Sequence, residues 1–259
     1  MVVLSGGEID RFMDEGFVRV RAAFDRNLAE AVRDVAAEQL RIDLGCPSTW
    51  TSPVVRGMVT GEPLRRAAAS PALNEAIGQL LHGEDWAPRQ DLGAFVVRFP
   101  SNADPGDAGW HIDSSFQPPG DERWFVNYRS KHRGLLLLCL VSDVAEDDAP
   151  TRILVGSHRK MPDLLRPAGE AGLPGAFAGQ RSQIPLPDTA GVVELAVGDA
   201  GDVFVCHPFL VHAASWPHRG ATPRFVTQPP IGVSDSLNLD RPRSRLSPVA
   251  SAIRRALST

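Results

Sequence analysis

The residues Trp110-His111-Ile112-Asp113 place an imidazole and a carboxylate two positions apart in the chain. On an extended segment, residues two apart project to the same side, roughly 6.6 Å from each other along the backbone. Such a pair can occupy neighbouring positions on one metal ion, and a second imidazole would complete a two-His-one-carboxylate face with open positions for other ligands. An HxD triplet often arises by chance, so the pair alone is a weak signal.

A second imidazole is available about a hundred residues later. The apolar run from Val203 to Cys206 predicts a strand, and it is followed by His207 and His212. The two histidines are five positions apart, an odd number, so on a straight strand they would face opposite sides, and Pro208 disturbs the pairing. From the residues alone, either histidine is a candidate for the third ligand.

Arg224 follows His212 by twelve positions and opens a largely apolar strand, where it shares one face with Val226 and Gln228. A buried arginine needs an anionic partner, because burying the charge alone is very costly. A dicarboxylic co-substrate held by the guanidinium fork would be such a partner.

Four segments in this order resemble the phytanoyl-CoA dioxygenase family of iron/2-oxoglutarate oxygenases. They are WHID at 110–113, TRILVGSHR at 151–159, GDVFVCHPFLVH at 201–212, and Arg224. The resemblance implies that Fe(II) binds His111, Asp113 and His212, while His207 is a structural residue. It also implies that Arg224 pairs with 2-oxoglutarate, that O₂ is consumed, and that the fold is a double-stranded β-helix, a jelly-roll variant.

Further site residues follow from the resemblance. The family often has a second basic residue upstream, for which Arg56 is the candidate, and Leu138 falls on the central strand that lines the co-substrate pocket. The family often has a small or hydroxyl residue two positions after the distal histidine, and here it is Ala214. We expect Thr151 or Ser215 to supply the missing hydroxyl contact to 2-oxoglutarate.

The resemblance predicts hydroxylation of a small molecule, with conversion of 2-oxoglutarate and O₂ to succinate and CO₂. Family members that halogenate have a small residue in place of the carboxylate ligand, so Asp113 argues against halogenation. Desaturation, epoxidation, cyclisation and epimerisation on the same centre stay open. A zinc hydrolase could use the same three ligands, although Arg224 and the GSHR turn argue against it. A catalytically silent jelly-roll binding protein is the remaining alternative.

A basic cluster separates the metal motif from the next predicted strand; it comprises Arg123, Arg129, Lys131, His132 and Arg133. The simpler interpretation is a solvated loop or edge strand. The functional interpretation is a surface that favours an anionic group of the substrate, such as a carboxylate or phosphate. The cluster is short, and the formal net charge is −4, so neither a nucleic acid nor an anionic membrane is expected as a partner. The oligomeric state is left open.

The elements that must position these residues are predicted from periodicity and end signals. Helices are expected from the capping box Ser5-Gly6-Gly7-Glu8, over 25–40, from Ser70-Pro71 to about 82, and over 248–257. Strands are expected over 17–20, 93–99, 134–141, 191–195, 202–207 and 224–231. Residues 167–188 are rich in glycine and proline and predict a long loop over a site.

This order of elements predicts an α+β protein with a mainly β core. Together with the family resemblance, it implies one oxygenase domain over 1–259. We expect a mostly helical part over 1–90, the jelly-roll core over 91–232, and a C-terminal tail and helix over 233–259. The composition is ordinary for a globular chain, with 43% hydrophobic and 22% charged residues.

The cellular setting is also predicted from composition. The three cysteines have no CxxC spacing, which favours reduced thiols. The chain starts without a signal-peptide pattern, and its longest apolar run, Leu135 to Val141, is too short to span a bilayer. We therefore expect a cytoplasmic protein. The bias toward Arg, Ala, Gly and Pro indicates a GC-rich genome and bacterial small-molecule metabolism.

Overall fold

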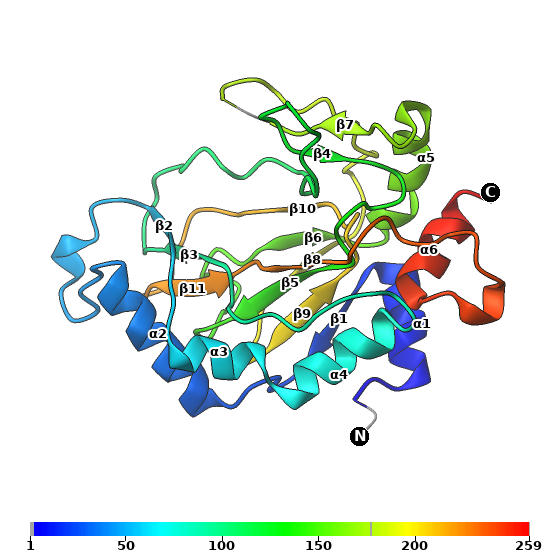
Figure 1. Ribbon diagram of the computed structural model, residues 1–259. Helices are drawn as coiled ribbons and strands as arrows, with labels where there is room; N and C mark the ends of the chain where they lie inside the picture. The colour runs from blue at the N-terminus through cyan, green and yellow to red at the C-terminus, as the bar shows by residue number, and fades with distance from the viewer. Residues whose placement is uncertain (1–2, 177, 259) are drawn as a thin grey trace.

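The computed structural model describes residues 3–176 and 178–258 and has an antiparallel seven-stranded sheet at its centre (Figure 1). The strand order is β1 (Phe17–Val20), β9 (Val203–Cys206), β5 (Leu135–Leu140), β11 (Arg224–Thr227), β3 (Ala94–Arg98) and β2 (Val54–Met58). β12 (Pro230–Ile231) also pairs with β5. Strands that are far apart in the sequence are therefore neighbours in this sheet.

A smaller sheet packs against one face of the main sheet. It contains β10 (His212–Ala213), β6 (Arg152–Leu154) and β8 (Val193–Leu195). Leu138 of β5 and Val226 of β11 pack in one buried cluster with Ile153 of β6. A two-stranded sheet of β4 (Phe125–Val126) and β7 (Leu173–Pro174) lies near the top of Figure 1.

Helices cover the other face of the main sheet. Helices α2 (Arg26–Gln39), α3 (Glu62–Ala68) and α4 (Pro71–Leu80) run beneath it in Figure 1. Helices α1 (Gly6–Glu15), α5 (Met161–Leu165) and α6 (Pro248–Ala256) gather at one end. Short 3₁₀ turns complete the chain: η1 (Pro47–Thr49), η2 (Ser157–Arg159), η3 (Arg166–Ala168) and η4 (Arg243–Arg245).

The composition of β5 explains this layering. All six of its residues are buried, and alternate side chains join two different clusters. Leu135, Leu137 and Cys139 pack on the helical side, whereas Leu136, Leu138 and Leu140 pack toward the smaller sheet. A strand buried on both faces has a nearly continuous apolar sequence rather than an alternating one.

Most of the predicted elements are confirmed. The Ser5 capping box forms with both of its hydrogen bonds, and α1 ends at Gly16 in the left-handed region, at φ 93°. Ser70 precedes α4 as expected, but its side chain does not cap the helix and instead donates to the Ala23 carbonyl. The strand predicted over 224–231 is two strands, because proline at positions 229 and 230 has no N–H to continue the ladder.

The main sheet also extends beyond the predicted core of 91–232, since β1 and β2 come from the first 60 residues. Only β1 was expected from the sequence. The predicted loop over 167–188 is mostly irregular, although it contains η3 and β7, and Phe177 lies outside the described residues. None of the described helices is long and apolar enough to cross a membrane.

Candidate metal centre

Three side chains predicted to hold a metal converge at one point. Ligand atoms of His111, Asp113 and His212 all lie within 4.8 Å of one another. The backbone positions two of them, because the N–H groups of His111 and His212 each donate to the carbonyl of the other over 3.0 Å. The imidazole ring centroids are consequently 4.4 Å apart. Asp113 approaches through Oδ1, which is 3.8 Å from Nε2 of His111.

Both imidazoles present Nε2 to this point. Nδ1 of His111 is 2.8 Å from the Gly109 carbonyl, and Nδ1 of His212 is 3.0 Å from the Leu210 carbonyl. A carbonyl can only accept, so each Nδ1 carries the proton and each Nε2 keeps its lone pair. Nε2 of the buried His212 has no hydrogen-bond partner among the described residues. A buried polar atom without a partner is costly unless a ligand binds it.

The electrostatics favour the metal-binding protonation states. Burial alone would raise the pKa of Asp113, but His212, Arg133 and His111 lower it, and the pKa lies below its ordinary value. Burial lowers the pKa of His212. An ionised carboxylate and a neutral imidazole are the forms that coordinate divalent transition metals. The donor set therefore fits Fe(II) or a similar ion.

Arg152 connects the two segments that carry these ligands. Its Nη2 atom donates to the Ala108 carbonyl at 2.6 Å and to the Ala214 carbonyl at 3.1 Å. The guanidinium carbon also lies 4.7 Å from the centre of the Trp110 ring. One side chain thus binds both the chain entering His111 and the chain leaving His212.

Arg224 is buried at the start of β11, with 3% of the residue exposed. It lies on the same face of the strand as Val226, which packs toward the smaller sheet that carries His212. Its Nη1 atom donates to the Ala149 carbonyl, and its Nε atom has no partner among the described residues. Burial and the nearby Arg98 lower the pKa of Arg224 to about 9. The cation is available for an anion in the layer between the sheets.

Sequence reasoning missed Arg98, which lies directly across from Arg224 in the β3–β11 ladder. Only 2% of Arg98 is exposed, and its Nη2 donates to both carboxylate oxygens of Asp107 at 2.6 Å. The signal was present in the sequence, because Arg98 is the one charge in an otherwise apolar strand. The reasoning that selected Arg224 applies to it equally.

The other residues predicted to contact the co-substrate lie in different environments. Arg56 lies on β2 with 52% of its side chain exposed, and it pairs with Asp107. Leu138 is buried in the layer that Arg224 faces. Thr151 is buried immediately before β6, whereas the Ser215 hydroxyl donates to the Pro150 carbonyl at 2.6 Å and is used within the fold.

The basic cluster divides into separate environments. Arg123 pairs with Asp121, and Arg129 pairs with Asp240 at 3.0 Å. Arg133 is buried, with Nη1 lying 3.4 Å from Oδ2 of Asp113. His132 is exposed, and Lys131 is partly buried, with its ammonium 5.5 Å from the centre of the Phe116 ring.

His207 lies away from the three converging side chains. It is buried, its Nδ1 accepts from the Phe209 N–H at 3.1 Å, and its ring is 4.8 Å from that of His158. Burial lowers the pKa of both histidines, that of His158 to about 4. These contacts are those of a structural histidine pair in the core.

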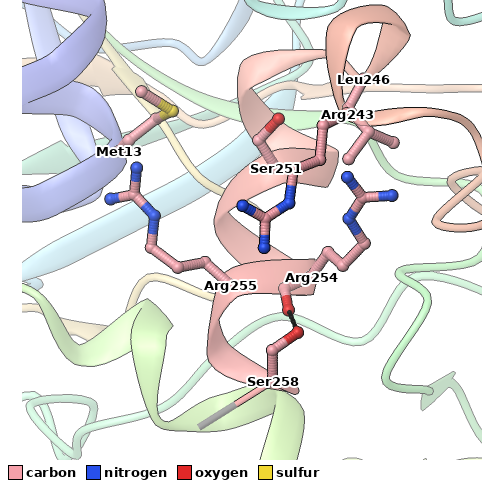
Figure 2. A pocket seen from close by; sticks show the side chains of 7 residues that line it. All are labelled: Met13, Arg243, Leu246, Ser251, Arg254, Arg255 and Ser258. Atoms are coloured by element: carbon pink, nitrogen blue, oxygen red, sulfur yellow. Dashed lines mark hydrogen bonds between the residues drawn. The ribbon is translucent and has the colours of Figure 1, made fainter.

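A cavity of about 410 Å³ lies elsewhere, against the C-terminal helix. Figure 2 shows its side chains, which come from α1, α6 and the segments on either side of α6: Met13, Arg243, Leu246, Ser251, Arg254, Arg255 and Ser258. It shares no residue with the metal centre. This cavity therefore plays no part in the chemistry of the metal centre.

The arrangement is that of a candidate metal centre, with a buried arginine on the neighbouring strand, in a scaffold of sheets and helices. The phytanoyl-CoA dioxygenase (PhyH) family matches residues 3–226. The chain belongs to this family, and its reaction class is that of a non-haem iron oxygenase that uses 2-oxoglutarate and O₂. No curated protein matches the sequence.

Several solved structures share the fold. HygX from Streptomyces hygroscopicus, solved with nickel, 2-oxoglutarate and hygromycin B bound, is 17% identical over 89% of this chain and 88% of that chain, with a TM-score of 0.57. GIG2 (DUF1479) from Candida albicans is 17% identical over 91% of this chain and 64% of that chain, with a TM-score of 0.62. The non-heme alpha ketoglutarate dependent epimerase SnoN from nogalamycin biosynthesis is 15% identical over 89% of this chain and 82% of that chain, with a TM-score of 0.54.

Proposed function

We propose that this oxygenase holds Fe(II) with His111, Asp113 and His212 and hydroxylates a small molecule. The observation that carries the assignment is the buried Nε2 of His212, which has no hydrogen-bond partner within residues 3–176 and 178–258 and lies beside the other two ligands. The proposed fold is a double-stranded β-helix, in which the main sheet and the β10-β6-β8 sheet enclose the centre. HygX, which has the same fold at low identity, was solved with nickel and 2-oxoglutarate bound.

The bound metal would supply redox chemistry, coupling the oxidative decarboxylation of 2-oxoglutarate to oxidation of the substrate. The protein's own residues would position the reactants. Arg224 is proposed to pair with the distal carboxylate of 2-oxoglutarate, with Leu138 as an apolar wall and Thr151 as a hydroxyl contact. Arg56 is proposed as a second basic residue for the co-substrate; it pairs with Asp107, which Arg98 also binds.

The loop over 167–188 is proposed to cover the substrate side of the centre. A Cβ atom added at Gly175 would lie 2.3 Å from Oγ of Ser114, the residue that follows Asp113. The N–H of Gly175 also donates to the Trp124 carbonyl at 2.8 Å. This contact brings the loop against the metal-binding segment, where it can exclude water during reaction.

The substrate is proposed to be a small molecule with an anionic group, and to approach Lys131. Arg123 and Arg129 already have carboxylate partners, and Arg133 faces Asp113. HygX was solved with hygromycin B, a small molecule, in addition to the co-substrate. A Lys131→Met variant should raise the substrate KM while leaving the 2-oxoglutarate KM unchanged, and equal effects on both would contradict this role.

Hydroxylation or a related oxidation is proposed over halogenation because Asp113 retains the carboxylate ligand. SnoN is an epimerase, so desaturation, epoxidation, cyclisation or epimerisation on the same centre remains the second candidate. In mass spectrometry of the product, hydroxylation and epoxidation add one oxygen atom, desaturation and cyclisation remove two hydrogen atoms, and epimerisation leaves the mass unchanged. NMR of the product then separates an alcohol from an epoxide. A cytoplasmic setting is proposed from the three cysteines, all of which are free thiols.

The metal assignment is tested by replacing each ligand with alanine. His111→Ala, Asp113→Ala and His212→Ala should each abolish formation of succinate from 2-oxoglutarate, while circular dichroism stays unchanged. His82→Ala, at an exposed histidine outside the centre and outside the basic cluster, is the matched control and should retain activity. Full activity in Asp113→Ala would refute the assignment, and activity with zinc but without iron and 2-oxoglutarate would indicate a hydrolase.

A further inference from the structure

Arg133 is a buried cation that lies beside a proposed metal ligand. Only 8% of the residue is exposed. Its Nη1 atom is 3.4 Å from Oδ2 of Asp113. Neither Nη1 nor Nε makes a hydrogen bond within the described part of the chain. Such a group is expensive to bury, so its position requires an explanation that a solvated basic loop does not supply.

The fold holds Arg133 rigidly. The Arg133 N–H donates to the Ser130 carbonyl at 3.1 Å, and the Ser130 hydroxyl donates to the Arg133 carbonyl at 2.8 Å. The next residue, Gly134, begins the paired run of β5 by donating to the Ile231 carbonyl at 2.8 Å. At the other end of the side chain, Nη2 donates to the Ser114 carbonyl at 2.7 Å. The guanidinium is therefore fixed relative to the segment that carries Asp113.

The two oxygens of the Asp113 carboxylate face different neighbours. Oδ1 is the atom near His111, at 3.8 Å from Nε2, whereas Oδ2 is the atom near Arg133. A carboxylate can bind a metal through one oxygen or through both. When the second oxygen is engaged by a cation, one-oxygen binding is favoured, and a coordination position on the metal stays open.

We propose that Arg133 is a positioning residue that keeps Asp113 a one-oxygen ligand and so preserves the open position that co-substrate or O₂ requires. This inference rests on the proposed metal centre at His111, Asp113 and His212. It makes an unusual prediction about affinity. Loss of Arg133 removes a nearby positive charge and frees Oδ2 for the metal, so metal binding should not weaken although turnover should fall.

The test uses Co(II) as a spectroscopic probe in the full-length protein without oxygen. The variants are Arg133→Met, which removes the charge and the donors, and Arg133→Gln, which retains an N–H for the Ser114 carbonyl. Arg123→Met is the matched control, because Arg123 belongs to the same basic cluster but pairs with Asp121. Calorimetry gives the Kd for Co(II), visible absorption per bound ion reports the coordination number, and succinate formation with Fe(II) gives turnover.

In Arg133→Met we expect a Kd for Co(II) equal to or lower than that of the wild type, weaker absorption per bound ion because the coordination number rises, and turnover reduced about 10- to 100-fold. Arg133→Gln should be intermediate, which keeps the test valid if the methionine variant does not fold. Arg123→Met should match the wild type in all three measurements.

Two results would overturn the proposal. Wild-type absorption and turnover in Arg133→Met would show that Arg133 does not act on Asp113. A raised Kd with unchanged absorption per bound ion would show that Arg133 only supports the local structure. If the wild type and His212→Ala bind Co(II) equally, the metal centre itself fails, and that outcome is distinct from either of these.

Discussion

Replacing Arg224 with methionine should weaken the binding of 2-oxoglutarate without lowering the stability of the ligand-free protein. Methionine fills a similar volume without the charge. Burial and Arg98 lower the pKa of Arg224 from 12.5 to about 9, a difference that corresponds to about 5 kcal/mol for holding the cation at neutral pH. Because 9 lies above 7, the guanidinium is still charged at neutral pH, and the protein without ligand bears this cost.

Binding of the 2-oxoglutarate carboxylate would offset the cost of burying this cation. A guanidinium–carboxylate pair with two charge-assisted hydrogen bonds contributes about 3 to 6 kcal/mol, at about 1.5 to 3 kcal/mol for each bond. Arg224→Met should therefore weaken the binding of 2-oxoglutarate about 10²- to 10⁴-fold. The ligand-free variant should be at least as stable as the wild type, because it no longer buries an unpaired cation.

The assay is anaerobic titration calorimetry with 2-oxoglutarate on the Co(II)-loaded protein, together with urea unfolding of the ligand-free protein. Arg33→Met is the matched control, since Arg33 lies on the surface and pairs with the neighbouring Asp34. A Kd within about threefold of the wild type would refute Arg224 as the clamp, and Arg56→Met and Arg98→Met would then be measured. A ligand-free variant that is several kcal/mol less stable would refute the argument that the buried cation is a cost.

Three further predictions concern a glycine turn, a buried histidine and the metal centre. Gly16→Ala should lower the free energy of unfolding by about 2 to 4 kcal/mol, because Gly16 has φ 93° and an added Cβ would lie 2.5 Å from His158; Gly7→Ala, where the added atom meets nothing within 4 Å, should not lower it. The pKa of His158 is about 4 in the folded protein, against an ordinary value of 6.5. The unfolded chain therefore takes up a proton at this residue below pH 6.5, and the free energy of unfolding falls by about 3 kcal/mol as the pH drops from 6.5 to 4. The free energy of unfolding, measured with urea and plotted against pH, should have a slope in His158→Gln that is smaller by one proton over this range. An unchanged slope would contradict the prediction. Adding Co(II) at 100 times its Kd should stabilise the wild type by about 2.7 kcal/mol and leave His212→Ala unchanged in thermal unfolding, whereas equal shifts would place the metal elsewhere.

Local features of this protein could be predicted from its sequence because they depend on neighbouring residues. The capping box at Ser5 needs only residues within one helical turn. The continuous apolar run of β5 indicates a strand covered on both faces, whatever covers it. The spacing of His111 and Asp113 brings both side chains to one side of an extended segment.

Other local predictions failed where a tertiary partner competed. Ser70 has the residue type and position of a helix cap, yet its hydroxyl donates to Ala23 instead. The β2 strand was not expected, because its partner β3 lies about 40 residues further along the chain. A pairing of this kind depends on the backbone of another segment, so it cannot be predicted from the residues of the strand alone.

The metal centre illustrates the same division. The sequence by itself determined that a two-His-one-carboxylate set was available, but residue spacing left His207 and His212 as equal candidates for the second imidazole. The tertiary structure decides which one meets His111, because β10 hydrogen-bonds to the His111 segment while His207 packs against His158 in the core. Only the structure brings Arg98 beside Arg224 and Arg133 beside Asp113. The physical reason is that the chemical groups are given by the residues themselves, whereas the distance between residues far apart in the sequence depends on how the whole chain packs.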